Sequence, residues 1–460
     1  MRTVSFNQLV ATDNVEHLGQ GIFIPSICTD TRKLLPGQAF LALVGENFDG
    51  HDFLEQAVAM GASSLIINNT QKDRLSFLTN EAVDVVLCEN TLQTLGNIAK
   101  LHREHFATVK VFAITGSCGK TTVKQMLSSI LATDGKVLAS PNSFNNEIGL
   151  PLTLLELDAS YKYVVLEMGA RATGDVKYLC NIAKPHVSIV TNVAPVHLET
   201  MFSLDNIAKI KAEIFTHTID DGHVIVNVDD QYAPSWFNML GSQRVTTFAI
   251  ERLADVTIAF ISQNLSSSKI ELVTEYGTID IIIPVPGGHN IMNALGAAAM
   301  ALAAGLNLEQ IKAGLSNLKN VGRRLEYLDG INGSKIIDDS YNANPVSVMA
   351  ALDILSNYNQ HKIFVFSDML ELGSDKEEYH SLIGRQTKKM GIDEFLTVGP
   401  LAALAAQEYG PSAKSFSSKN DLIRYLLATL NENSIVLIKG SNGQKLNEIV
   451  EKIVLATPAL

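Results

Sequence analysis

A short glycine-rich segment has the residue types that bind the phosphates of a nucleotide. It reads Thr115-Gly116-Ser117-Cys118-Gly119-Lys120-Thr121-Thr122. Glycines let backbone N–H groups approach phosphate oxygens, and the start of a following helix adds a favourable dipole. In such loops the lysine reaches the β- and γ-phosphates, and the threonine after it holds Mg²⁺. The segment therefore predicts an ATP site, with Lys120 and Thr121 as its main binding groups.

The loop is shorter than the common phosphate-binding pattern, which places four residues between its first glycine and the Gly-Lys pair. Here only two residues separate Gly116 from Gly119, so an ordinary strand-to-helix turn is the alternative interpretation. The flanking sequence favours the phosphate loop. An apolar run at 111–114 predicts a strand, and apolar residues at helical spacing over 123–131 predict a helix.

Two polar residues end the next predicted strands, which is where ligands bind in open α/β sheets. Glu167 ends the apolar run 163–167, and Asn192 ends the run 187–192, with His197 just beyond it. We expect Glu167 to bind Mg²⁺ rather than to cap a helix, because Mg²⁺ prefers carboxylate oxygens together with substrate phosphates. His197 taken alone is more typical of a hydrogen-bonded loop histidine.

Two further candidates lie on predicted helices and are weak signals when taken singly. Lys211 lies within the run 207–215, where a lysine normally faces solvent. Asn290 and Asn293 are three residues apart, so they share one helix face and could bind a base or a ribose. Helix capping is the simpler interpretation of the two asparagines.

The elements that must position these residues fall into three predicted units. A chain of 460 residues exceeds one core and suggests about three domains. We predict a small α/β domain over 1–105, with strands near 21–25, 39–43, 65–67 and 83–87. A parallel α/β ATPase domain follows over 106–320. A doubly wound, Rossmann-like α/β domain completes the chain over 321–460, with strands near 335–339, 362–366, 395–398 and 435–438.

Composition excludes several classes of function. The net charge of −12 argues against nucleic acid or an anionic membrane surface as a partner. No apolar run reaches the roughly 18 residues of a membrane span, and the first residues lack the apolar core of a signal peptide. Four distant cysteines fit no zinc spacing and indicate free thiols. We therefore expect a cytoplasmic protein.

Motifs in all three units resemble the Mur ligases, ATP-dependent amide-forming enzymes of peptidoglycan precursor synthesis. The resemblance runs from about residue 26 to 450. Its segments, besides the phosphate loop, are Asp30-Thr31-Arg32, Asp49-Gly50-His51-Asp52-Phe53, Asn145-Asn146-Glu147, Glu167-Met168-Gly169-Ala170, His197-Leu198-Glu199, Gly288-His289-Asn290, Asp339-Ser340-Tyr341-Asn342-Ala343-Asn344-Pro345 and Asp368-Met369-Leu370-Glu371-Leu372-Gly373.

The resemblance implies a role for each candidate. Lys120 would bind the β/γ-phosphates, and Thr121 with Glu167 would hold one Mg²⁺. His197 would ligate a second Mg²⁺, together with Lys211 as a carbamate. ATP would also contact Gly116, Ser117, Cys118, Gly119, Thr122, Asn290, Asn293, Arg324 and Asp339. The other substrates would contact Asp30, Arg32, Asn47 and Asp49 at the uridine end, and Asn145, Asn146, Tyr341 and Asn344 elsewhere.

The strings at 341–345 and 368–373 are typical of the family members that add D-alanyl-D-alanine to UDP-N-acetylmuramoyl-tripeptide. The implied reaction is an amide ligation through an acyl phosphate, by a monomer acting on small molecules. Two alternatives remain. A folylpolyglutamate synthetase shares the ATPase design but normally lacks the first domain. A nucleotide-binding scaffold or switch would lack this turnover.

Several positions depart from the family's usual pattern. Arg323 replaces the glycine before Arg324, Asn442 replaces an arginine, and Ala212 replaces a glycine. The pair Arg171-Ala172 replaces Asn-His. No departure removes a residue assigned to the reaction. A tripeptide with diaminopimelate at its third position and one with lysine there are both compatible with the sequence.

Overall fold

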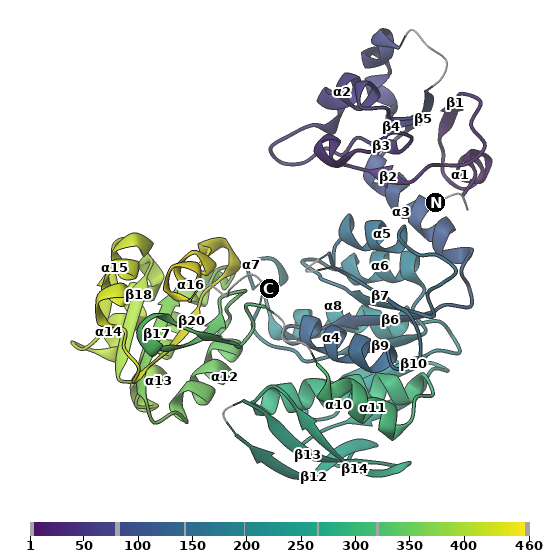
Figure 1. Ribbon diagram of the computed structural model, residues 1–460. Helices are drawn as coiled ribbons and strands as arrows, with labels where there is room; N and C mark the ends of the chain where they lie inside the picture. The colour runs from purple at the N-terminus through teal and green to yellow at the C-terminus, as the bar shows by residue number, and fades with distance from the viewer. Residues whose placement is uncertain are drawn as a thin grey trace.

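The computed structural model describes residues 4–78, 83–141, 144–196, 198–264, 266–318 and 322–455. It contains three sheets, each with its own helices, and Figure 1 shows them as three bodies along the chain. The predicted three-domain α/β architecture is confirmed. The boundaries near 105 and 320 stay predictions, and the second of them lies outside the described residues.

The first sheet has the strand order β1-β5-β4-β3-β2, with β1 antiparallel and the other strands parallel. Three of the four predicted strands formed, but the prediction at 21–25 was wrong. Only Phe23 pairs there, as a single bridge to Ser5, and Pro25 has no N–H to extend the ladder. The elements are α1 (Phe6–Thr12), β1 (Glu16–Leu18), β2 (Ile27–Cys28), β3 (Ala39–Leu41), α2 (Leu54–Ala59), β4 (Ser64–Asn68), β5 (Asp84–Cys88) and α3 (Thr91–Glu104).

Helix α3 joins the first domain to the central one. Its side chains Leu95 and Ile98 complete the apolar core under the first sheet. Ile148, Leu152 and Leu155, from the segment around α5 (Gly149–Leu154) of the central domain, pack against the same core. Figure 1 shows α3 between the first sheet and the helices α5 and α6 (Asp175–Ala183). The two domains therefore share part of one hydrophobic core.

The central sheet has the order β14-β13-β12-β11-β10-β9-β6-β8-β7. Its apolar strands are covered by helices on both faces, as a parallel sheet requires. The strands are β6 (Lys110–Thr115), β7 (Val137–Ala139), β8 (Tyr163–Glu167), β9 (Val187–Val190), β10 (His223–Asn227), β11 (Arg244–Phe248), β12 (Val256–Gln263), β13 (Ser268–Thr274) and β14 (Gly277–Ile283). The remaining helices are α4 (Lys120–Leu131), α7 (Leu198–Met201), α8 (Leu204–Thr216), α9 (Ala233–Phe237), α10 (Gly288–Ala303) and α11 (Leu308–Ser316).

One edge of the central sheet differs from the predicted parallel arrangement. Strands β12, β13 and β14 pair antiparallel to one another. Only Glu275 and Tyr276 lie between β13 and β14, too few residues for the crossover that a parallel pair needs. This extension lies at the edge far from β6 and leaves the phosphate-loop end of the sheet as predicted.

The third sheet has the order β15-β16-β20-β17-β18-β19 and is parallel apart from β15. All four predicted strands formed. The elements are β15 (Glu326–Asp329), β16 (Lys335–Asp339), α12 (Pro345–Ser356), β17 (His361–Ser367), α13 (Lys376–Lys389), β18 (Glu394–Val398), α14 (Pro400–Tyr409), β19 (Lys414–Phe416), α15 (Lys419–Thr429), β20 (Ser434–Lys439) and α16 (Asn447–Ile453). Short 3₁₀ turns complete the chain: η1 (Thr31–Lys33), η2 (Gly50–Phe53), η3 (Asn69–Phe77), η4 (Ile331–Gly333), η5 (Gly373–Asp375) and η6 (Asn442–Gln444).

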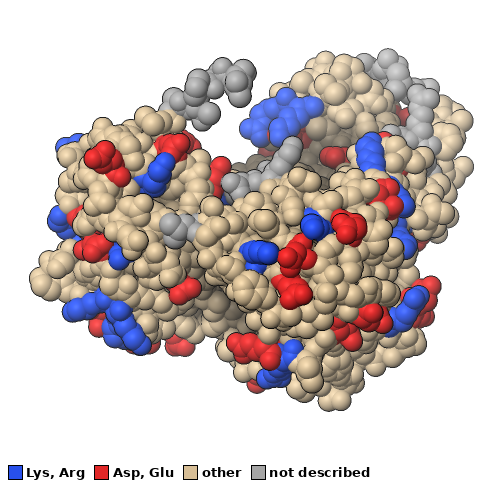
Figure 2. All heavy atoms as spheres, turned by 60° about the horizontal axis from the view of Figure 1, so that its bottom comes forward, with Lys and Arg blue, Asp and Glu red and all other residues tan. Residues whose placement is uncertain are grey.

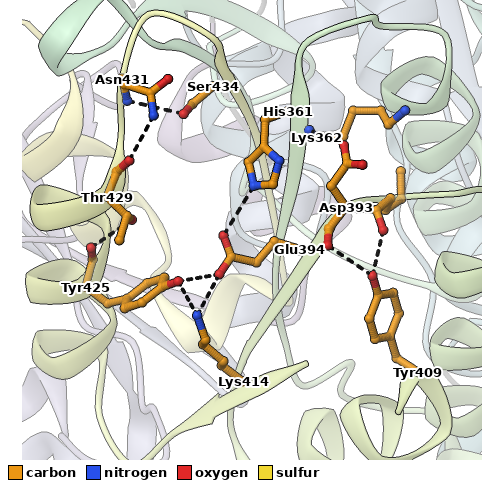
Figure 3. A network of polar contacts seen from close by, with 11 residues as sticks. His361, Lys362, Asp393, Glu394, Tyr409, Lys414, Tyr425, Thr429, Asn431 and Ser434 are labelled. Atoms are coloured by element: carbon orange, nitrogen blue, oxygen red, sulfur yellow. Dashed lines mark hydrogen bonds and ion pairs between the residues drawn. The ribbon is translucent and has the colours of Figure 1, made fainter. Parts of the chain in front are cut away.

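A polar network joins the starting ends of three strands in the third sheet (Figure 3). Glu394 Oε1 accepts hydrogen bonds from the Tyr425 hydroxyl of α15 and from Lys414 Nζ, which lies 3.0 Å away. His361 Nε2 lies 3.7 Å from Glu394 Oε2. Burial favours a raised pKa for Glu394, but these donors outweigh it and lower the pKa. The network fixes α15 to the sheet at the edge opposite the strand ends that carry Asp339 and Lys439.

No described helix is both long and apolar enough to cross a bilayer.

Candidate active site

A cavity of about 350 Å³ lies between the central and third domains. The phosphate loop, Glu167 and α10 line one side, and the segments after β16 and at the end of β20 line the other. Figure 2 shows a hollow between the third domain, on the left, and the rest of the molecule, with basic and acidic side chains interspersed over this face. Cavities at the carboxyl ends of parallel strands are the usual ligand sites of such folds.

The phosphate loop joins β6 to α4, as predicted, and its two glycines have steric reasons to be there. Gly116 and Gly119 have positive φ of 147° and 81°. A Cβ at Gly116 would lie 1.9 Å from Thr191 Oγ1, and one at Gly119 would lie 2.3 Å from Asn293 Oδ1. The short loop is therefore a close-packed backbone turn in which side chains are excluded at both positions.

The segment after β9 holds this loop in place. The Ser117 N–H donates to the Asn192 carbonyl oxygen at 2.9 Å, and the Cys118 N–H donates to Asn192 Oδ1 at 3.0 Å. Thr191 Oγ1 in turn donates to the Cys118 carbonyl oxygen at 2.6 Å. The strand-end residue Asn192 thus supports the loop, in addition to lining the cavity.

Two lysines meet at the first glycine of the loop. Lys120 Nζ donates to the Gly116 carbonyl oxygen at 2.7 Å, and Lys211 Nζ donates to the same oxygen at 3.0 Å. Lys211 is only 2% exposed, so the solvated helix face that its sequence position suggested is excluded. Burial, followed by the charge of Lys120, lowers the pKa of Lys211 well below its ordinary value. This shift favours the neutral form of the Lys211 amine, which lies next to the phosphate loop.

Glu167 is buried at the end of β8, as predicted, and both of its oxygens have partners. Thr121 Oγ1 donates to Oε2 at 2.8 Å, and Asn145 Nδ2 donates to Oε1 at 2.9 Å. Burial favours a raised pKa, but Lys120 and Lys124 outweigh it and lower the pKa of Glu167. The side chain is therefore an ionised carboxylate beside a hydroxyl, a donor set that suits Mg²⁺ with substrate phosphates.

Two lysines around this site received no role from the sequence. Lys124 lies 3.5 Å from Glu167 Oε2, and Lys439 pairs with Asp339 across the cavity from the phosphate loop. The signal for Lys124 was its spacing, four residues after Lys120 on a helix where the apolar Val123 and Leu127 flank its face. Both lysines are about 2% exposed.

The predicted nucleoside-binding side chains of α10 do line the cavity. Asn290 and Asn293 are buried, next to His289, at the start of the helix. Asn290 Nδ2 donates to the Pro286 carbonyl oxygen at 2.7 Å, which uses one of its donors and leaves Oδ1 for other partners. Gly287 is the N-cap of α10 and no side chain caps this end of the helix, so the capping interpretation of the two asparagines is wrong.

The third domain brings four predicted residues to the cavity. Arg324 Nη2 donates to Thr121 Oγ1 at 3.1 Å, and its guanidinium stacks 4.1 Å from the centre of the Tyr341 ring. Asn344 caps α12 and also places Nδ2 3.1 Å from Cys118 Sγ. Asp339 pairs with Lys439. The contacts of Arg324 with Thr121 and of Asn344 with Cys118 bridge the two domains at the phosphate loop.

Arg323, which replaces the family's glycine, has a positive φ of 63°. Its guanidinium donates to the Ser340 carbonyl oxygen at 3.0 Å. Arg323→Gly and Arg323→Ala lose the same hydrogen bonds, but only alanine keeps the left-handed strain. We expect the glycine variant to be more stable by about 1 kcal/mol, seen as a higher urea midpoint. Equal midpoints would contradict the steric reason for a glycine here.

Other predicted substrate residues lie away from the cavity. Asp30 is bound by Arg32, whose guanidinium lowers the pKa of that carboxyl to about 2, and Asp49 lies 2.6 Å from His51 Nδ1. The predicted residues Asp30, Arg32 and Asp49, and the exposed Asn47, all belong to the first domain. Asn146 Oδ1 accepts hydrogen bonds from the Gly149 N–H, which begins α5, and from the Ile148 N–H before it, and Asn146 is absent from the described cavity lining. His197 lies outside the described residues.

Sequence comparison covers all three domains. Models described as the Mur ligase family catalytic domain, the Mur ligase middle domain and the Mur ligase glutamate ligase domain match residues 24–103, 114–301 and 323–442. A UDP-N-acetylmuramoyl-tripeptide–D-alanyl-D-alanine ligase of Escherichia coli K12 is 36% identical over 98% of this chain and 99% of its own length. The chain belongs to the Mur ligase family.

Solved structures agree with this membership. The Mur ligase MurF of Acinetobacter baumannii is 32% identical, has a TM-score of 0.90, and is matched over 97% of this chain and 98% of that one. The MurF ligase of Thermotoga maritima in complex with ADP, 24% identical with a TM-score of 0.80, shares the fold over 93% and 97% of the two chains. This Mur ligase therefore resembles its relatives in all three domains.

Proposed function

We propose that this Mur ligase joins D-alanyl-D-alanine to UDP-N-acetylmuramoyl-tripeptide with hydrolysis of ATP to ADP and phosphate. The observation that carries the proposal is the Thr121–Glu167 pair beside the phosphate loop, facing Arg324 and Tyr341 of the third domain across one cavity. The name of the Escherichia coli relative, with 36% identity along nearly the whole chain, supports the choice of substrates.

The proposed reaction has two steps. A carboxylate oxygen of the tripeptide attacks the γ-phosphorus of ATP, the bond to the β-phosphate oxygen breaks, and an acyl phosphate forms. The dipeptide amine then attacks the acyl carbon, loses a proton, and expels inorganic phosphate. Lys120 and the N–H groups at the start of α4 stabilise the phosphate charge as it develops, and Arg324 supplies a cation from the third domain.

The residues around Glu167 fit a divalent cation, because an ionised carboxylate and a hydroxyl lie 2.8 Å apart next to the phosphate loop. Mg²⁺ bound there would neutralise charge on the transferring phosphoryl group. We further propose a second ion held by His197 and by Lys211 as a carbamate. The lowered pKa of Lys211 favours the neutral amine that reacts with CO₂.

The remaining assignments divide the substrates among the domains. Asp30, Arg32, Asn47 and Asp49 would bind the uridine end in the first domain. Asn145 would guide the tripeptide carboxylate toward the γ-phosphate, because it already contacts Glu167. Asn146 would act indirectly, by shaping the start of α5. The nucleoside would lie against Asn290 and Asn293, and the protein would act as a monomer.

The test is phosphate release from ATP with UDP-muramoyl-tripeptide, with and without D-alanyl-D-alanine. We expect release to require both substrates and a pentapeptide product to appear in the mass spectrum. Phosphate release with a single amino acid in place of D-alanyl-D-alanine would assign the chain to a different Mur reaction. The assignment of the ATP site would be unaffected. Slow hydrolysis that ignores both substrates would favour a nucleotide switch.

A folylpolyglutamate synthetase remains the second candidate within the enzyme class. Such enzymes normally lack the first domain, whereas residues 24–103 of this chain match a Mur ligase model. Adding folate and glutamate to the same assay distinguishes the two reactions.

A further inference from the structure

Helix α4 carries a buried lysine one turn beyond the phosphate-binding lysine. Lys124 follows Lys120 by four residues and Thr121 by three, so the three side chains share one side of the helix. Lys124 is 2% exposed, and its Nζ donates to the Ser140 carbonyl oxygen at 2.8 Å. The same Nζ lies 3.5 Å from Glu167 Oε2. The ammonium group of Lys124 therefore lies beside the Glu167 carboxylate, on the side that faces the protein interior.

Burying this ammonium is costly unless its partners are well placed. The neighbouring positions Val123 and Leu127 are fully buried and apolar, so a methionine or leucine would suit the packing. Burial lowers the pKa of Lys124, and the carboxylate of Glu167 acts against that shift. The Ser140 carbonyl and the Glu167 carboxylate are therefore the groups that stabilise the charged form of Lys124 in this buried position.

Lys124 closes a ring of contacts around Glu167. The Ser140 carbonyl accepts from Lys124, and Ser140 Oγ accepts from the Glu167 N–H at 3.3 Å. The carboxylate is then held by Thr121 and Lys124 on Oε2 and by Asn145 on Oε1. Through this ring the end of β7, the end of β8 and helix α4 maintain one orientation of the carboxylate.

We propose that Lys124 is a positioning residue that orients Glu167 for the divalent cation. The inference rests on the proposed function only in treating Glu167 as a cation ligand. A carboxylate has about four acceptor sites on its two oxygens, so Lys124 and a cation can share Glu167. Lys124 binds the Ser140 carbonyl at the same time, which keeps its ammonium on the protein side of the carboxylate.

The test measures ADP binding by calorimetry, once with Mg²⁺ and once with EDTA. In the Lys124→Met variant we expect the gain in affinity due to Mg²⁺ to fall about tenfold, while ADP affinity in EDTA changes by less than about twofold. A general structural loss would weaken both measurements. If Mg²⁺ raises the ADP affinity of Lys124→Met as much as that of the parent protein, or more, the proposal is overturned. Lys124 would then only compete with the cation for the Glu167 carboxylate.

Matched variants make the result specific. Lys124→Arg keeps the cation and should restore the Mg²⁺ gain to within about threefold of the parent protein. Lys136→Met removes an exposed lysine from the start of β7 and should change nothing. Where Lys124→Met does not fold, Lys124→Gln removes the charge but keeps a donor for Ser140, and the same tenfold loss is expected.

The outcome also separates this inference from the proposed function. No Mg²⁺ gain in the parent protein would overturn the cation role of Glu167 and, with it, the role of Lys124. A normal gain that Lys124→Met leaves intact would overturn the positioning role alone. Dipeptide ligation would still be open to the phosphate-release assay in either case.

Discussion

A Lys120→Ala variant is expected to release phosphate about a hundred- to a thousandfold more slowly at saturating substrates. The loss follows from removing a preorganised cation from the loop on which the phosphoryl charge develops. Lys120 Nζ already lies 2.7 Å from the Gly116 carbonyl, so it is in place before any substrate arrives. Phosphate release with ATP and both proposed substrates measures the effect.

The control for this variant is Lys136→Ala, because Lys136 is an exposed lysine of the same domain that donates to Ser160. It should keep the parent rate. A loss of less than about tenfold in Lys120→Ala would contradict the assignment of Lys120 to the transferred phosphate. Arginine should not restore the rate, since a planar guanidinium does not fit the space of a compact ammonium.

Lys211→Ala is expected to lose about a hundredfold or more in turnover and to recover part of it when short carboxylic acids such as acetate are added. The reason is the proposed carbamate, a carboxylate-like group that acetate can imitate in the space left by the side chain. Lys211 is buried beside the loop, with its Nζ 3.0 Å from the Gly116 carbonyl. Loss of activity without recovery would weaken the carbamate.

The parent protein should show a matching dependence on pH and CO₂. Burial and Lys120 lower the pKa of Lys211, so the reactive neutral amine persists well below the pH at which an exposed lysine becomes protonated. As the pH falls through this lowered pKa, the amine takes up a proton, the carbamate is lost, and turnover falls. Added bicarbonate should restore turnover on this acid side, and Lys211→Ala should show no such response.

The features that were predicted well from the sequence depend on residues that lie close to one another along the chain. The phosphate loop was recognisable because strand, glycines, lysine and helix follow one another within about twenty residues. Glu167 was predictable because parallel strands place their carboxyl ends at one edge. Most strands of the third domain were found for the same reason, since each is a short apolar run followed by a helix.

The features that were missed depend on contacts between distant segments. Lys124 gains its role only through Ser140 and Glu167, which lie outside α4, after β7 and at the end of β8. Lys211 received its role only through the family resemblance, because its position alone predicts a solvated residue and nothing near it in sequence indicates its burial against Gly116. The antiparallel edge of the central sheet is instead a local feature, since only Glu275 and Tyr276 join β13 to β14, and such a short connection indicates a hairpin.

The core shared by the first two domains has a consequence for the protein during its synthesis. The five strands of the first sheet have all been made once Cys88 leaves the ribosome. Phe6 and Leu9 of α1 already pack on this apolar core, but it still lacks Leu95 and Ile98, and then Leu152 and Leu155, which emerge later. The nascent chain must therefore expose part of one apolar sheet face until the central domain has begun to emerge, and this interval is when a chaperone would be most useful.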